Sequence, residues 1–124
     1  MVIRIQGLAY QKGFGGHFHN DNGFASLREI PGIIIACPSN GVSAYNLLRE
    51  CVRLAKQEQR VVIFLEPIAL YFVKDAYAYV EAAIDPCNFN TPGIESNGQD
   101  FIIISYGNGA HLSRQALQQI KTTY

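Results

Sequence analysis

One glycine-rich segment, residues 15–22, concentrates the side chains that are best suited to chemistry. His17 and His19 stand two positions apart, with Phe18 between them and Asn20 directly after. An imidazole titrates near neutral pH, so it can donate or accept a proton, and in its neutral form it can bind a metal ion. These residue types are compatible with acid/base work, oxyanion binding or a metal site. Histidines that only hydrogen-bond the loop backbone are the structural alternative.

A metal site would need more ligands than these two imidazoles. Residues two apart on an extended backbone share one face, so both rings can reach one ion. Asp21 is the nearest acidic residue, and no cysteine lies in the segment. Because zinc usually takes three or four protein ligands, we predict no metal site in this segment.

The elements around this segment predict a parallel α/β sheet with flanking helices. Residues 2–6 alternate in the manner of a strand, and residues 33–37 and 61–65 are continuous apolar runs typical of buried parallel strands. Between those runs, Ser39 and Asn40 offer N-caps to an amphipathic helix. Its apolar positions are Ala44, Leu47, Leu48, Cys51, Val52 and Ala55. Ligands in such sheets bind outside the carboxyl ends of the strands, where the histidine loop follows the first strand.

The composition excludes several classes of protein. Of 124 residues, 48% are hydrophobic and 16% are charged, with a net charge of zero, which favours a folded domain without a basic surface for nucleic acid or anionic membranes. Neither a membrane-spanning run nor a secretion signal is present, so we predict a cytoplasmic protein. The three cysteines, Cys37, Cys51 and Cys87, include no C-x-x-C pair and indicate neither a disulfide framework nor a zinc knuckle.

The pattern changes after residue 69. Tyrosines and proline-containing turns predict an irregular linker over residues 76–99, which separates a first domain (1–75) from a second (100–124). In the second domain, residues 101–105 predict a strand, and Asn108 is a candidate N-cap for a helix. One strand and one helix do not complete a core, so we expect exposed apolar surface here.

Several motifs in order resemble the β-subunit half of thiamine-diphosphate-dependent 2-oxo acid dehydrogenases, first components of the branched-chain and pyruvate type. Each motif is weak alone, but their succession over residues 1–71 is specific. They are residues 17–22 (HFHNDN), 30–32 (IPG), 36–39 (ACPS) and 64–71 (FLEPIALY). Residues 106–109 (YGNG) resemble the opening of the transketolase C-terminal domain that follows in the family. The resemblance implies the C-terminal part of a pyrimidine-binding domain, then the first strand and helix of the next domain.

The resemblance also implies a reaction, a cofactor and partners. Family members decarboxylate a 2-oxo acid on thiamine diphosphate and pass the acyl group to a lipoyl group. The divalent metal that binds the diphosphate is held by the partner half. The implied partners are the α half or subunit, the lipoyl acyltransferase component and further copies in a homo-oligomer. Because the activating glutamate lies upstream of Met1 in the family, this chain alone is expected neither to bind the cofactor nor to turn over.

Position by position, His19 matches the active-site histidine of the family's His-Ser-Gln-Ser stretch and is the expected catalytic residue. His17, Phe18 and Asn20 are the expected pocket residues. Residues 20–22 read Asn-Asp-Asn instead of Ser-Gln-Ser, so the surrounding contacts differ from the family's. Glu66 is expected to be a structural, hydrogen-bonding carboxylate at a strand end.

Two alternative functions stay open. The chain is either a non-catalytic remnant that serves as an interaction domain, or part of a transketolase-type transferase with the same domains. The histidine loop and the Leu65-Glu66-Pro67 segment look more like the dehydrogenases.

Overall fold

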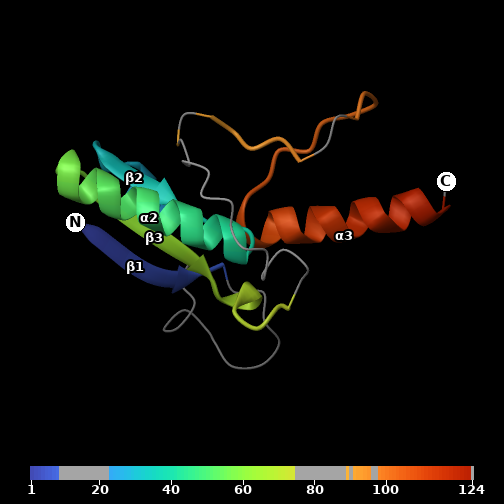
Figure 1. Cartoon of the computed structure of the whole chain (residues 1–124), viewed down its shortest axis with the longest axis horizontal. Helices are drawn as coiled ribbons and strands as arrows, with labels where there is room; N and C mark the ends of the chain where they lie inside the picture. Colours follow the sequence, from blue (N-terminus) through green and yellow to red (C-terminus); the bar gives the residue numbers. More distant parts are fainter. Residues whose placement is uncertain (9–22, 75–88, 90, 96–97, 124) are drawn as a thin grey trace.

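A three-stranded parallel sheet organises the computed structural model, which describes residues 1–8, 23–74, 89, 91–95 and 98–123 (Figure 1). The strand order is β1-β3-β2, and β3 pairs in parallel with both neighbours. The elements are β1 (Val2–Gly7), α1 (Phe24–Arg28), β2 (Ile33–Ala36), α2 (Gly41–Gln57), β3 (Val61–Pro67), the 3-10 helix η1 (Ile68–Leu70) and α3 (Gly107–Thr123). The predicted parallel α/β arrangement is thus confirmed, including the strand–helix–strand crossover β2-α2-β3.

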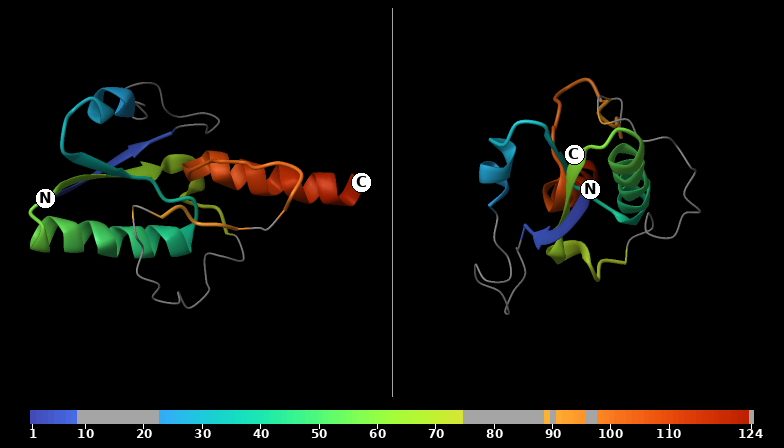
Figure 2. Two further views of the ribbon diagram at one scale, coloured as in Figure 1. Left: turned by 90° about the horizontal axis from the view of Figure 1, so that it is seen from above. Right: turned by 90° about the vertical axis from the view of Figure 1, so that its left-hand side faces the viewer.

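The central strand β3 is the most buried element. Its continuous apolar run lies between two strands and beneath α2, which explains why it shows no polar alternation. Helix α2 covers one side of the sheet, and α1 lies on the other side beside β2 (Figure 2). The core between α2 and the sheet consists of Ala36, Cys51, Leu54, Val62 and Phe64.

A capping box starts α2 at the predicted position. The Asn40 side chain accepts a hydrogen bond from the Ser43 backbone N–H at 2.7 Å, and the Ser43 hydroxyl accepts one from the Asn40 N–H at 3.0 Å. These bonds satisfy two of the N–H groups that a helix start leaves without partners. A local signal in the sequence therefore determines where this helix begins.

The predicted apolar face of α2 is partly wrong. Val52 is half-exposed, whereas Leu54 is buried against the sheet. Successive helical residues are rotated by about 100°, so Val52 lies beside the stripe that contains Cys51 and Leu54. Val52 is therefore rotated away from the buried stripe, and it faces solvent.

The strand predicted over residues 101–105 does not form. These residues carry no strand hydrogen bonding, and Ile102 and Ile104 are 87% and 94% exposed. A β-strand requires a hydrogen-bonding neighbour, and the edges of this sheet, β1 and β2, do not pair with the segment. The apolar composition of residues 101–105 is therefore not sufficient to predict a strand.

The helix predicted after this segment is confirmed as α3, with a different start. The helix begins at Gly107, so Asn108 is its second residue and does not cap it. Helix α3 extends beyond the carboxyl ends of the strands (Figure 1). No helix in the described part of the chain is long and apolar enough to cross a membrane.

Candidate functional site

The carboxyl ends of β1, β2 and β3 lie at one edge of the sheet, where parallel α/β proteins bind ligands. The predicted site residues His17, Phe18, His19 and Asn20 lie outside the described residues. The structure describes the chain up to Leu8, the residue directly after β1. Leu8 is buried and has a positive φ of 51°. The loop that carries the predicted site therefore departs from this carboxyl edge.

The start of α3 packs against the same edge. A Cβ at Gly107 would lie 3.0 Å from both Cys37 Sγ and Leu8 Cδ1, so the helix approaches the strand ends as closely as glycine permits. The next residue, Asn108, is buried, and its side-chain amide donates a hydrogen bond to the Leu8 carbonyl at 3.4 Å. Helix α3 is thereby joined to the end of β1.

Replacing Gly107 with alanine is expected to lower the free energy of unfolding by about 1–3 kcal/mol. The new methyl group meets Cys37 and Leu8, and the φ of +54° is unfavourable for any residue with a Cβ. Urea unfolding followed by circular dichroism measures the change. The matched control is Gly93→Ala, where the structure leaves open space, and its effect is expected to stay within about 0.5 kcal/mol. Equal effects of the two substitutions would contradict the close approach of α3.

A cavity of about 960 Å³ opens beside the carboxyl end of β2. Its wall includes the start of α2, the loop at residues 91–95 and the start of α3. Two aromatic rings of this wall, Phe24 and Tyr106, make an edge-to-face contact at 6.3 Å between centroids. The cavity thus combines aromatic surface with the polar side chains of Ser39, Asn40, Ser43 and Ser105.

Arg114 of α3 joins three of these segments beside the cavity. Its guanidinium binds the Glu95 carboxylate through Nε at 2.8 Å and through an Nη at 2.6 Å, and it also donates to the Ser39 hydroxyl at 3.0 Å. The hydrogen bonds from Arg114 hold the pKa of Glu95 below its ordinary value of 4.5. This carboxylate is therefore ionised and engaged at neutral pH, and a proton-transfer role does not fit it.

The two described cysteines are suited to packing rather than to nucleophilic chemistry. Cys51 is completely buried in the core. Cys37 is half-buried at the end of β2, and burial raises the pKa of its thiol to about 11. Because the thiolate is the reactive form, Cys37 is unreactive at neutral pH. Within the ranges that the structure describes, no group of three His, Cys, Asp or Glu residues is arranged to hold a metal ion.

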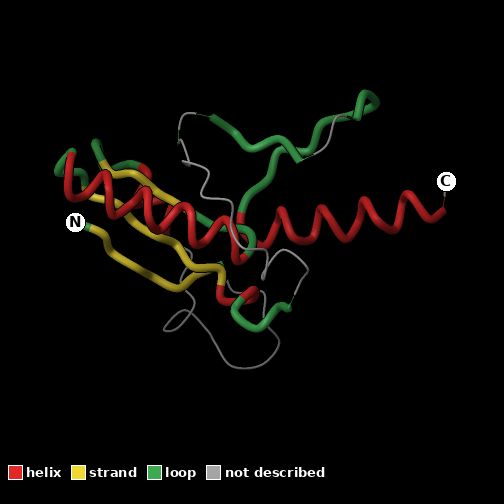
Figure 3. Tube along the Cα trace, in the orientation of Figure 1, coloured by secondary structure: helices red, strands yellow, loops and turns green. Residues whose placement is uncertain are grey.

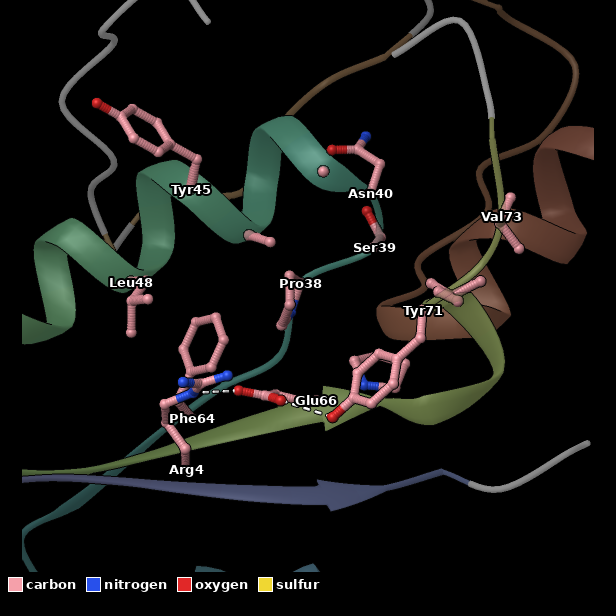
Figure 4. A pocket seen from close by; sticks show the side chains of 14 residues that line it. Arg4, Pro38, Ser39, Asn40, Tyr45, Leu48, Phe64, Glu66, Tyr71 and Val73 are labelled. Atoms are coloured by element: carbon pink, nitrogen blue, oxygen red, sulfur yellow. Dashed lines mark hydrogen bonds and ion pairs between the residues drawn. The ribbon is translucent and has the colours of Figure 1, made fainter. Parts of the chain in front are cut away.

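A second cavity, of about 360 Å³, lies between α2 and the end of β3 (Figure 4). Its wall is mostly apolar, with Tyr45, Leu48 and Phe64 among its residues. On its floor, the Glu66 carboxylate accepts hydrogen bonds from Arg4 Nε and from the Tyr71 hydroxyl, the latter at 2.6 Å. These bonds link β1, β3 and the turn after η1.

The protonation states of Glu66 and Tyr71 suit a structural role, and we call the three residues Arg4, Glu66 and Tyr71 the clamp. Desolvation tends to raise the pKa of Glu66, but the hydrogen bonds from Arg4 and Tyr71 outweigh it and hold the pKa below 4.5. Burial and the bond to Glu66 raise the pKa of Tyr71 to about 12. Neither group changes protonation near pH 7, so Glu66 is the structural carboxylate that the sequence predicts, and not an acid or base catalyst.

We predict that the contribution of the clamp to the free energy of unfolding is lost in acid. A carboxyl group whose pKa is lowered by folding stabilises the fold above its unfolded pKa and loses that contribution as the pH falls through the folded value. Glu66→Gln is expected to cost about 1 kcal/mol at pH 7, and the difference from the native chain is expected to be smaller at pH 3. Urea unfolding at both pH values measures it.

The matched control for this experiment is Glu29→Gln. The Glu29 side chain is 73% exposed and pairs only with the neighbouring, equally exposed Arg28 among the described residues. Such surface pairs contribute little, so the substitution is expected to leave stability unchanged at either pH. A Glu66→Gln effect that stays constant between pH 7 and pH 3 would show that lost packing, and not ionisation, explains it.

The sequence did not single out Arg4, Tyr71 or Arg114. For Arg4 a signal exists in hindsight, because a charged residue shares a strand face with the partly buried Val2. Comparisons with protein-family models, with curated proteins and with solved structures found no match to this chain. Its function must therefore be argued from its own residues.

Proposed function

We propose that this chain is part of a thiamine-diphosphate-dependent 2-oxo acid dehydrogenase that transfers an acyl group to lipoyl. The observation that carries the proposal is the ordered succession of four family-like motifs within residues 17–71, which begins with the histidine loop. In this proposal residues 1–75 belong to the pyrimidine-binding domain, and residues 100–124 begin the transketolase C-terminal domain. His19 acts as the proton donor or electrostatic partner, beside His17, Phe18 and Asn20.

The parallel arrangement of the strands supports one part of the proposal, the position of the site at the carboxyl edge of the sheet. The loop with residues 17–20 follows β1 at the carboxyl edge, the position that suits a ligand site in a parallel sheet. The aromatic rings and hydroxyl groups of the cavity at this edge suit a planar polar heterocycle such as the cofactor's aminopyrimidine. They do not suit its metal-bound diphosphate, because Glu95, the carboxylate in that cavity wall, is engaged by Arg114.

An assay of the assembled enzyme tests this proposal. The complete reading frame is expressed with the gene of the implied α half and supplied with thiamine diphosphate, magnesium and a lipoyl domain. We expect acylation of the lipoyl domain with pyruvate or branched-chain 2-oxo acids, and no ketol transfer between sugar phosphates. Ketol transfer would assign the chain to the transketolase-type enzymes, and the absence of both activities would favour a non-catalytic interaction domain.

The 124-residue chain alone is expected to bind thiamine diphosphate weakly, with a dissociation constant above about 1 mM, which corresponds to a binding free energy of only about 4 kcal/mol. The physical reason is that the proposal places the metal and diphosphate site on the partner half, so most of the cofactor's polar contacts are missing. Isothermal titration calorimetry with magnesium present measures this. Micromolar binding would contradict the proposed division of the cofactor site between two halves.

A further inference from the structure

The Arg114 guanidinium is held in place by groups other than its carboxylate partner. Its Nη2 donates to the Ser39 hydroxyl at 3.0 Å and its Nη1 to the Ser39 carbonyl at 3.4 Å, so the turn before α2 fixes the plane of the group. The Arg114 side chain is only 17% exposed. The edge formed by Nε and Nη2 binds both oxygens of Glu95, which is the bidentate geometry in which arginine recognises a carboxylate.

Glu95 is the member of this pair that can leave. Its side chain is 62% exposed, and it belongs to the loop at residues 91–95, whereas Arg114 belongs to helix α3 (Figure 3). Water can solvate the Glu95 carboxylate once it departs, and ion pairs with an exposed member contribute little to stability. A carboxylate from solution can therefore compete with Glu95 for the same edge of Arg114.

The cavity of about 960 Å³ lies directly beside this edge. Ser39 and Glu95, which Arg114 binds, are both part of the cavity wall, so a carboxylate that replaces Glu95 lies at the cavity surface. The rings of Phe24 and Tyr106 line the same cavity and suit an apolar or aromatic body. We infer that this cavity binds a small organic acid of that kind, whose carboxylate takes the place of Glu95 on Arg114. The inference does not depend on the proposed function.

The charges around the cavity favour an anion. Among the described residues, the wall carries two charged side chains, Arg28, which also pairs with Glu29, and Glu95. When Glu95 is displaced, the charged groups left beside the cavity are the two guanidinium groups of Arg28 and Arg114. The cavity also borders the start of α2, where the helix dipole adds positive potential. A carboxylate is therefore favoured over a neutral molecule of the same shape.

NMR titration of the 124-residue chain with phenylacetate tests the inference. Because Glu95 competes within the same chain at an effective concentration of about millimolar, we expect binding in the millimolar range. Phenylacetamide has the same shape without the charge and is expected to bind at least about tenfold more weakly. Acetate keeps the charge without the ring and is expected to bind at least about threefold more weakly.

Substitutions at the two ends of the pair separate competition from general electrostatics. Glu95→Gln removes the competing carboxylate and is expected to tighten phenylacetate binding by about threefold or more. Arg114→Gln is expected to weaken it at least about tenfold, and Arg114→Lys, which keeps the charge without the fork, at least about threefold. In the chain with Arg114→Gln, Glu95→Gln is expected to bring no further gain, because both substitutions act on one contact.

The matched control is Glu58→Gln. Glu58 is also an exposed carboxylate paired with an arginine, Arg53, but neither residue lines the cavity, so the affinity is expected to stay unchanged. Circular dichroism confirms that each variant folds. Absence of phenylacetate binding by both the native chain and Glu95→Gln would overturn the inference, as would an affinity that Glu95→Gln or Arg114→Lys leaves unchanged. Equal binding of phenylacetamide would overturn the role of the carboxylate, and equal binding of acetate that of the apolar body.

Discussion

Replacing His19 with alanine is expected to lower the turnover of the assembled enzyme by about 100- to 10,000-fold, the range that a positioned general acid or base contributes. The imidazole is the expected proton donor or electrostatic partner for the substrate or for the acyl-transfer step. Without it, charge that develops in the transition state loses its partner while the cofactor's own chemistry is unaltered. The rate of lipoyl acylation at saturating 2-oxo acid measures the loss.

Two further measurements separate a catalytic role of His19 from a structural one. The pH profile of the native enzyme is expected to show a group that titrates near neutrality, and the His19→Ala variant is expected to lack it. His17→Ala should reduce turnover less, since His17 is expected only to shape the pocket. The control is His111→Ala on α3, where the imidazole contacts Gln115 and activity should stay within about twofold. A His19→Ala enzyme with native turnover would remove this residue from the reaction.

The second large effect is a loss of stability that we expect when a core side chain is truncated. Phe64→Ala should lower the free energy of unfolding by about 3–5 kcal/mol, the usual cost of truncating a buried phenylalanine. Phe64 is 3% exposed on the central strand and belongs to the core cluster with Cys51 and Leu54. Because domains are stable by only about 5–15 kcal/mol in total, the variant is expected to lie close to unfolding.

The chain offers a matched control for the Phe64 substitution. Phe72 is 94% exposed shortly after the same strand, and Phe72→Ala is expected to change stability by less than about 0.5 kcal/mol. Thermal and urea unfolding, followed by circular dichroism, compare the two variants with the native chain. A small loss for Phe64→Ala would contradict the packing of α2 on the sheet.

The sequence predicted the elements whose signals are local. Residues 33–37 and 61–65 are continuous apolar runs, and each forms a strand of the parallel sheet. Asn40 and Ser43 are three residues apart, so the capping box that starts α2 could be recognised without knowledge of the rest of the fold. Helix periodicity likewise indicated most of the buried face of α2; the exceptions are Val52, which is exposed, and Leu54, which is buried but was not predicted.

The tertiary structure decided what depends on residues far apart in the chain. The pairing of Arg4 with Glu66 requires β1 to lie beside β3 in one particular register, and no local pattern reveals a partner 62 positions away. The close approach of Gly107 to Cys37 is of the same kind. Residues 101–105 have the composition of a strand, but a strand forms only where another strand provides hydrogen-bonding partners, and the described part of this chain provides none for them.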